Sequence, residues 1–282
     1  MAHAVQSQDY GKSDIQFLTV RRSADAQELR EIFLSIQFEG DFVSVFSDGD
    51  NSQLLPTGTM VNTAYALGHD YLNAPLDEYA CAVADRLLAA CPAATAVCIH
   101  AHETPWQRLT LYGWPHPHSF ADTGGAQTGF VIRSERDMPP AVQGSLSGLR
   151  LLKTTRSSFT GFLRDEFTTV APQKDRVMGA ELDLTWDYQS RPDDSRVTVG
   201  KVLAAVREAF CEHTSASGQQ TLFVLGTAAL RACPEVARIH LTCRARDHVE
   251  INLEPFGRVN QGQIYVAPHN PYSLVHLTVN RE

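Results

Sequence analysis

The order of secondary-structure patterns most restricts the fold of this chain, because nearly the same order occurs in both halves. Segments rich in β-branched and aromatic residues predict strands, and apolar residues at helical spacing predict helices. In the first half, strands are expected at 15–22, 30–40, 95–104, 106–113 and 128–136, and helices at 57–71 and 75–91. In the second half, strands are expected at 148–155, 176–189, 237–245, 248–256 and 273–280, and helices at about 199–210 and 216–232. A short helical piece is expected near GFLRDEF, residues 161–167.

Short links between consecutive strands favour antiparallel pairing. Two strands, two helices and two or more further strands in each half form a weak repeat of architecture rather than of sequence. The expected fold class is therefore α+β, with antiparallel sheets and helices packed on one face. The prolines of DMPPAV interrupt pairing, which predicts a first domain over 1–138 and a second over 139–282.

Composition excludes several classes of function. The chain has 282 residues and a formal net charge of -8, which argues against a broad nucleic-acid surface but not against a local pocket for a small anion. It contains no apolar run long enough to span a bilayer and none of the GxGxxG, Walker or GxSxG motifs. The six cysteines are scattered, which favours reduced thiols in a cytoplasmic protein.

Several polar residues have ordinary structural explanations when each is taken alone. HPH at 116–118 is expected to form a tight hairpin turn rather than a metal site, because no further ligand stands at metal spacing. Lys12 fits a solvated lysine, and Thr57 fits a helix cap. Arg176 fits an exposed strand residue, and Gln219 fits the first turn of a helix.

Taken together, the motifs run in order over nearly the whole chain. They are YGKSDI (10–15), FEGD (38–41), DNSQLLPTGTMVNTAYAL (50–67), PHPHSF (115–120), GLRLLKTT (148–155), GFLRDEFTTV (161–170), KDRVM (174–178) and SASGQQ (215–220). On these motifs the chain resembles the urate oxidase (uricase) family of the tunnelling-fold superfamily. The resemblance implies tandem tunnelling-fold domains, assembled as a homotetramer with active sites between subunits. It also implies oxidation of urate by O2 to 5-hydroxyisourate and hydrogen peroxide, with no metal and no organic cofactor.

The resemblance assigns substrate-binding roles to residues of the second half. The phenylalanine matching Phe159 stacks on the flat purine, as an aromatic face suits a planar ring. The arginine matching Arg176 grips the anionic edge of urate with its planar fork. The glutamine matching Gln219 offers a donor and an acceptor to the opposite edge. Gly218 stands where the family has a valine whose backbone is used, and glycine can supply the same backbone group. The charged run 164–166 is expected to hold a helix that presents Phe159.

Lys12 and Thr57 match the proton-relay pair of the family. A lysine acts as a base only when its ammonium form is destabilised by desolvation or a nearby cation. A threonine hydroxyl can pass a proton between that lysine and a water or peroxide above the ring.

The pattern breaks at CRARDHVEINL, residues 243–253. The family carries Asn-x-His here, with the asparagine holding O2 or water over the substrate and the histidine completing the relay. Counting along the strand places Ala245 at the asparagine position and Asp247 at the histidine position. His248 is one residue off and is expected on the other face of the strand. Asp247 either favours the ammonium form of Lys12 or acts as the base itself.

Three functions remain open from the sequence. The first is an active urate oxidase that tolerates these changes. The second is a homologue that oxidises a related purine or a pterin-like ring. The third is an impaired homologue that binds a ligand or only assembles. No nucleic-acid or membrane partner is expected for any of them.

Overall fold

The computed structural model describes residues 8–267 and 270–282, and it divides into two compact units. Unit 1 comprises Met1–Ser145 with Arg191–Arg196, and unit 2 comprises Leu146–Ser190 with Val197–Glu282. The sequence-based division between residues 138 and 139 stays a prediction.

Unit 1 builds its sheet from four strands in the order β1-β2-β3-β6, and neighbours in this order pair antiparallel. Helices α2 and α3 pack against this sheet, and a separate hairpin, β4–β5, lies between β3 and β6 in the chain. The elements are β1 (Asp9–Arg22), β2 (Gln27–Gly40), α1 (Val43–Ser47), α2 (Thr57–Asp70), α3 (Leu76–Ala90), β3 (Ala94–Glu103), β4 (Trp106–Leu111), β5 (Trp114–Asp122) and β6 (Gln127–Glu135).

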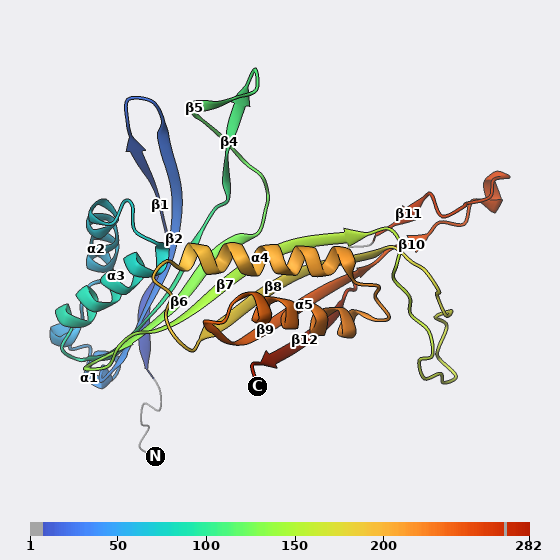
Figure 1. Ribbon diagram of the computed structural model, residues 1–282. Helices are drawn as coiled ribbons and strands as arrows, with labels where there is room; N and C mark the ends of the chain where they lie inside the picture. The colour runs from blue at the N-terminus through green and yellow to red at the C-terminus, as the bar shows by residue number, and fades with distance from the viewer. Residues whose placement is uncertain (1–7, 268–269) are drawn as a thin grey trace, which may run out of the picture. The chain divides into compact units, whose positions relative to one another are not determined.

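Unit 2 repeats this plan with strands in the order β7-β8-β9-β12 and a small β10–β11 hairpin between β9 and β12 in the chain. Helices α4 and α5 run over one face of its sheet (Figure 1). The elements are β7 (Ala141–Lys153), β8 (Met178–Tyr188), α4 (Ser195–Glu212), α5 (Gly218–Ala232), β9 (Val236–Asp247), β10 (Val249–Glu250), β11 (Tyr265–Val266) and β12 (Ser273–Asn280). The α+β class expected from the sequence, with helices on one face of antiparallel sheets, is therefore confirmed.

The core of each unit lies between its sheet and its helices. Along β8, the buried residues Leu182, Leu184 and Trp186 alternate with Glu181, Asp183 and Asp187, as a strand with one covered face requires. On the opposite face, charged residues pair across the strands. The guanidinium of Arg244 lies 2.6 Å from Asp183, and that of Arg246 lies 3.1 Å from Glu181.

The short helix expected near 161–167 is wrong, because this segment is a loop. Gly161 has a φ of 74°, outside the helical region. The Asp165 carboxylate accepts hydrogen bonds from the Phe167 N–H at 3.0 Å and from the Thr168 hydroxyl at 2.7 Å. These local side-chain bonds offer the backbone an alternative to a helix. Arg164 donates to the carbonyls of Thr168 and Val170 and closes the same loop.

Two further segments differ from the sequence-based expectation. HPH at 116–118 is not a turn, because it lies inside strand β5. Pro115 and Pro117 are tolerated because β5 belongs to a two-stranded hairpin, where one edge needs no backbone donors. The strand expected over 248–256 is only the two-residue β10, followed by a 3-10 turn at Glu254–Phe256 that contains Pro255.

A buried carboxylate joins α3 to Arg191 and Ser195 within unit 1. The Asp77 side chain is only 4% exposed, and it accepts from Arg191 at 2.9 Å and from the Ser195 hydroxyl at 2.5 Å. A buried carboxylate costs stability unless its oxygens are paired. Asp77 therefore needs Arg191 and Ser195 as hydrogen-bond donors, and both side chains in turn use Asp77 as an acceptor.

We expect Asp77→Ala to lower the free energy of unfolding by about 2–3 kcal/mol, because both partners lose their acceptor. Glu78→Ala is the matched control, since Glu78 is the other acidic residue in the first turn of α3 and is exposed. Denaturant melts of both variants and the wild type measure the difference. Equal losses from the two substitutions would show that the Asp77 contacts contribute nothing beyond the charge in the first turn.

Candidate active site

The segments that carry Lys12 and Thr57 are joined in unit 1 by a tyrosine. The Tyr10 hydroxyl accepts from the Leu55 N–H at 2.9 Å and donates to the Leu55 carbonyl at 3.1 Å. Lys12 lies two residues after Tyr10 on β1, and Thr57 lies two residues after Leu55 at the start of α2. This double hydrogen bond therefore holds the segment that carries Thr57 against the strand that carries Lys12.

The Tyr10 phenol keeps its proton over the ordinary pH range. Burial raises its pKa to about 12, and the nearby Cys91 side chain adds to the rise. Its ring packs edge-on against Phe42, with centroids 4.8 Å apart. A neutral phenol donates and accepts at once, as the two bonds to Leu55 require. Sequence reasoning missed Tyr10, whose only signal was its place in YGKSDI.

The strand around Lys12 is irregular. Lys12 pairs with Ile36 on β2, and the register then shifts between Lys12 and Ile15. Asp14, inside this bulge, has a φ of 55°. Such bulges redirect side chains and are frequent beside functional sites. At α2, Pro56 occupies the N-cap position, so Thr57 is the first helical residue and not the cap.

Phe159 and Arg176 meet in the long connection between β7 and β8 of unit 2. Phe159 and Gln173 exchange two backbone hydrogen bonds of 2.8 and 2.9 Å, and the Arg176 N–H donates to Ser157 at 2.7 Å. These bonds close the connection into a loop. They place the guanidinium carbon of Arg176 5.3 Å from the centre of the Phe159 ring. Phe162 stacks on Phe159, with centroids 4.8 Å apart and planes 14° apart.

Asp175 anchors both ends of this loop. Its carboxylate accepts from the Thr155 hydroxyl at 2.5 Å and from the Ser157 N–H at 3.1 Å. The Thr155 hydroxyl first, and then the Ser157 N–H, hold the pKa of Asp175 below its usual value. An ionised Asp175, directly before Arg176, is therefore held against Thr155 and Ser157.

The start of α5 joins the same cluster. Ser215 accepts from the Ser158 N–H at 2.8 Å and donates its own N–H to Arg156 at 2.9 Å, forming a parallel bridge. Ser217 is the N-cap of α5 and accepts from the Gln220 N–H at 3.1 Å. Gly218 and Gln219 are the first two helical residues. A Cβ at Gly218 would meet open space, so the position also has room for a larger residue.

Two cations at the end of α4 support this bridge. The Arg156 guanidinium donates to the carbonyls of Cys211 and Glu212, and the Lys153 ammonium donates to that of His213 at 2.5 Å. Cations beside the last carbonyls of a helix are favourable. Together they tie the end of α4 to the residues just before Phe159.

Ala245 and Asp247 lie near the end of β9, beside the start of β8. Asp247 pairs with Met178, two residues after Arg176, and Ala245 pairs with Ala180. The Asp247 side chain lies outside the described part of the structure, so its predicted catalytic role stays a prediction. His248 lies against Gly179, which pairs with Arg246 on the face opposite the helices. This position agrees with the expectation that His248 lies on the other face.

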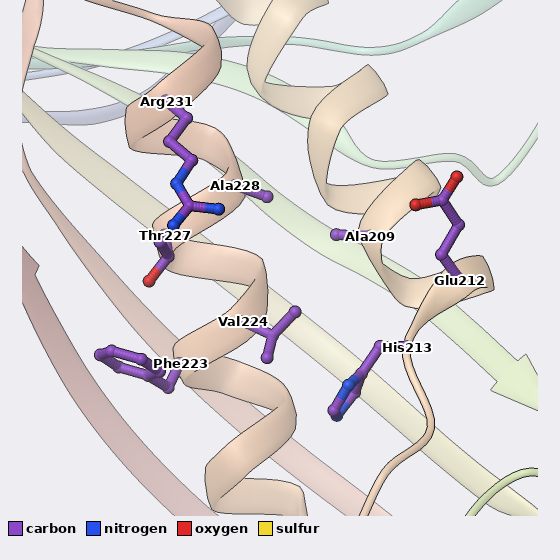
Figure 2. Close-up of a pocket in the computed structure, with 8 residues that line it drawn as sticks. All are labelled: Ala209, Glu212, His213, Phe223, Val224, Thr227, Ala228 and Arg231. Carbon is purple, nitrogen blue, oxygen red and sulfur yellow. The ribbon is translucent and has the colours of Figure 1, made fainter.

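A groove with a cavity volume of about 470 Å³ lies between α4 and α5 (Figure 2), and it contains none of the predicted site residues. Two buried polar atoms at this groove, His213 Nε2 and Thr227 Oγ1, have no hydrogen-bond partner among the described residues. Burial and the nearby Lys153 and Arg156 lower the pKa of His213. The groove is lined by Ala209, Glu212, His213, Phe223, Val224, Thr227, Ala228 and Arg231.

Within residues 8–267 and 270–282, no group of three or more His, Cys, Asp or Glu side chains is placed to hold a metal ion. In the same residues, no helix has the length and apolar character needed to cross a membrane.

Comparison with known proteins agrees with this architecture. A family model described as Uricase matches residues 8–131 and 142–276. Uricase of Arthrobacter globiformis is 28% identical over 273 residues, covering 97% of this chain and 88% of that one. Uricase of Oryctolagus cuniculus is 27% identical over 279 residues, covering 97% and 93%. The crystal structure of uricase from Arthrobacter globiformis matches with a TM-score of 0.93 at 26% identity, over 100% of this chain and 96% of that one.

The two matched segments account for almost all of the chain, and the fold agrees over its full length. The family expected from the ordered motifs is therefore confirmed: the chain belongs to the uricase family.

Proposed function

We propose that the protein oxidises urate with O2, giving 5-hydroxyisourate and hydrogen peroxide. The observation that carries this proposal is the uricase family match over nearly the whole chain. The relatives named Uricase come from organisms as distant as a bacterium and a rabbit. The cluster of Phe159, Arg176 and the start of α5 supports it, because these groups suit a flat, anionic, hydrogen-bonding ring.

In this proposal, unit 2 binds the substrate. Urate stacks on Phe159 in the place that Phe162 now occupies. The Arg176 guanidinium pairs with the anionic edge through two parallel hydrogen bonds. Gln219 and the Gly218 N–H face the opposite edge at the start of α5, where the helix dipole also favours negative charge.

Lys12 and Thr57 form the proton-transfer part of the site. Urate loses two electrons and O2 gains two, while a water molecule supplies the hydroxyl group of the product. The balanced reaction is urate plus O2 plus water to 5-hydroxyisourate plus hydrogen peroxide. An electron-rich urate anion can reduce O2 directly, so the protein has to remove protons and position the reactants. We propose that no metal and no organic cofactor takes part.

We further propose a homotetramer in the cytoplasm, with each active site completed between subunits. Large apolar side chains more than 70% exposed support assembly, because single chains rarely leave so many uncovered in hairpins and loops. They are Tyr112, Trp114, Leu163, Phe167, Phe256 and Val259. The assembly is measured by the molar mass of the purified protein in light scattering.

The proposed reaction is tested by mixing purified protein with urate in air. Loss of urate absorbance, O2 uptake and peroxide formation in equal amounts are the expected result. Binding of urate without turnover would overturn the proposed activity, and a panel of purines and pterins would then identify the ring that is oxidised. If the protein neither binds nor oxidises urate, the remaining interpretation is a protein that only assembles.

We expect Arg176→Lys to raise the KM for urate by about 10- to 100-fold, with a smaller effect on kcat. A lysine is a point charge and cannot make the two parallel bonds of a guanidinium, which costs about 1.4–2.7 kcal/mol. Arg150→Lys, an exposed position on β7, is the control and should match the wild type. An unchanged KM in Arg176→Lys would remove Arg176 from the proposed binding site.

We expect the double variant Ala245→Asn with Asp247→His to turn over urate faster than the wild type. It restores an amide that can hold O2 or water and an imidazole that titrates near neutral pH. Steady-state kcat and the pH profile measure the gain, which should come with a new dependence on a group of pKa near 6.5. No gain in kcat would contradict the placement of these two residues at the oxygen-handling positions.

A further inference from the structure

The register of β9 and β12 places a serine directly beside Ala245. Ser273, the first residue of β12, is the partner of Ala245, and the same register pairs Val275 with Cys243 and Val279 with Ile239. Residues directly opposite in an antiparallel pair point to the same face, with Cβ atoms about 4.5–5.5 Å apart. The Ser273 hydroxyl therefore stands next to the methyl group of Ala245.

This shared face is the one that α5 covers. A Cβ placed at Gly226 of α5 would lie 3.0 Å from Leu241 on β9 and 2.9 Å from Val279 on β12. Side chains along a strand alternate between faces. Ala245 lies four residues from Leu241, and Ser273 lies six residues from Val279, so both share their face.

The N-terminus of α5 reaches the same end of the sheet. Arg281 donates to the carbonyls of Leu230 and Cys233 at the end of α5, and to that of Val236 at the start of β9. The helix therefore runs along β9 from the Ala245 end toward the Val236 end. From Gly226, about 12 Å of helix leads back to Gly218, and about 13 Å of strand leads from Leu241 to Ala245. Gly218 and Gln219 thus begin near the Ala245–Ser273 pair.

At this end the side chains beside Ala245 are apolar on one strand and polar on the other. Ala180 flanks Ala245 from β8, and Ser273 flanks it from β12. Ser273 is exposed, so its hydroxyl is open to a small molecule. A hydroxyl donates one hydrogen bond and accepts two, which suits a water, O2 or peroxide. The nearby N-terminus of α5 favours a species that gains negative charge.

We propose that Ser273 holds the water or oxygen species over the bound ring, at the place where Ala245 has no polar group. This inference rests on the proposed urate oxidase function and assigns part of its oxygen handling to β12. Ser273 acts from the neighbouring strand β12, on the same face of the sheet as Ala245 and directly opposite it. The substitution at Ala245 is thereby compensated without any change in the substrate-binding residues.

The test compares Ser273→Ala, Ser273→Thr and Thr278→Ala in the full-length protein. Thr278 is the matched control, because it carries a hydroxyl on the same strand but on the opposite face, beside His240. Ser273→Ala should lower kcat by about tenfold, the effect of losing one hydrogen bond of about 1.4 kcal/mol. The dissociation constant for urate should stay within about twofold, since urate contacts other residues. Ser273→Thr should keep most of the activity, and Thr278→Ala should match the wild type.

A second set of variants, made in the Ala245→Asn protein, distinguishes a role of Ser273 in oxygen handling from a merely structural one. In Ala245→Asn, the new amide should take over, so adding Ser273→Ala should change kcat by less than twofold. An unchanged kcat in Ser273→Ala, or an equal loss in both backgrounds, would overturn the inference.

The inference and the proposed function are also separable. If the wild type binds urate but does not oxidise it, the proposed function fails, and crystal structures with bound xanthine decide the role of Ser273. An ordered water between the Ser273 hydroxyl and the ring, lost in Ser273→Ala, would support it. A Ser273 hydroxyl that bonds only to protein groups or to bulk solvent would overturn it.

Discussion

The backbone bridge between Ser157 and Ser215 is the contact on which the proposed substrate-binding half of the site depends. It joins two connections that are far apart in sequence, one after β7 and one before α5. Through it, the loop that carries Phe159 is held beside the start of the helix that carries Gly218 and Gln219. Arg156 reinforces the bridge from a left-handed backbone conformation, with a φ of 60°, because its guanidinium binds the last carbonyls of α4. Backbone hydrogen bonds position side chains more firmly than flexible side-chain contacts do.

The proposed oxygen-handling half of the site depends on strand register. Along β9, a shift of one residue moves every side chain to the other face of the sheet. Leu241, Cys243 and Ala245 therefore face the helices, while Arg244, Arg246 and His248 face away. An imidazole at 248 is consequently not a substitute for one at 247, although the two positions are adjacent. A hydroxyl at 273 shares the face of Ala245 because cross-strand partners, unlike sequence neighbours, point the same way.

The two proposed halves of the site differ in how closely they follow the pattern that the family resemblance implies. Phe159, Arg176 and Gln219 keep the residue types that suit a flat anionic ring. Ala245 and Asp247 depart from the Asn-x-His pattern that the family resemblance implies at the place for oxygen. Binding a ring and activating oxygen next to it are separate physical tasks, so one set of residues can change while the other stays. A hydroxyl supplied by a neighbouring strand is a small change that meets the same requirement for a donor.

The amino-acid sequence by itself determined the family, the α+β class and most of the strands and helices. Hydrophobic periodicity is a local property, and the ordered motifs extend over nearly the whole chain. It also predicted which residues would bind the substrate, and those roles stay predictions. It failed at 161–167, where local side-chain bonds of Asp165 compete with a helix, and at 116–118, where a hairpin edge tolerates proline. Only the tertiary structure decided that Tyr10 ties Leu55 to β1, that Ser215 meets Ser158, and that Ser273 stands beside Ala245. These pairs are separated by tens of residues, and strand register and backbone bridges arise from the packing of the whole chain rather than from any local pattern.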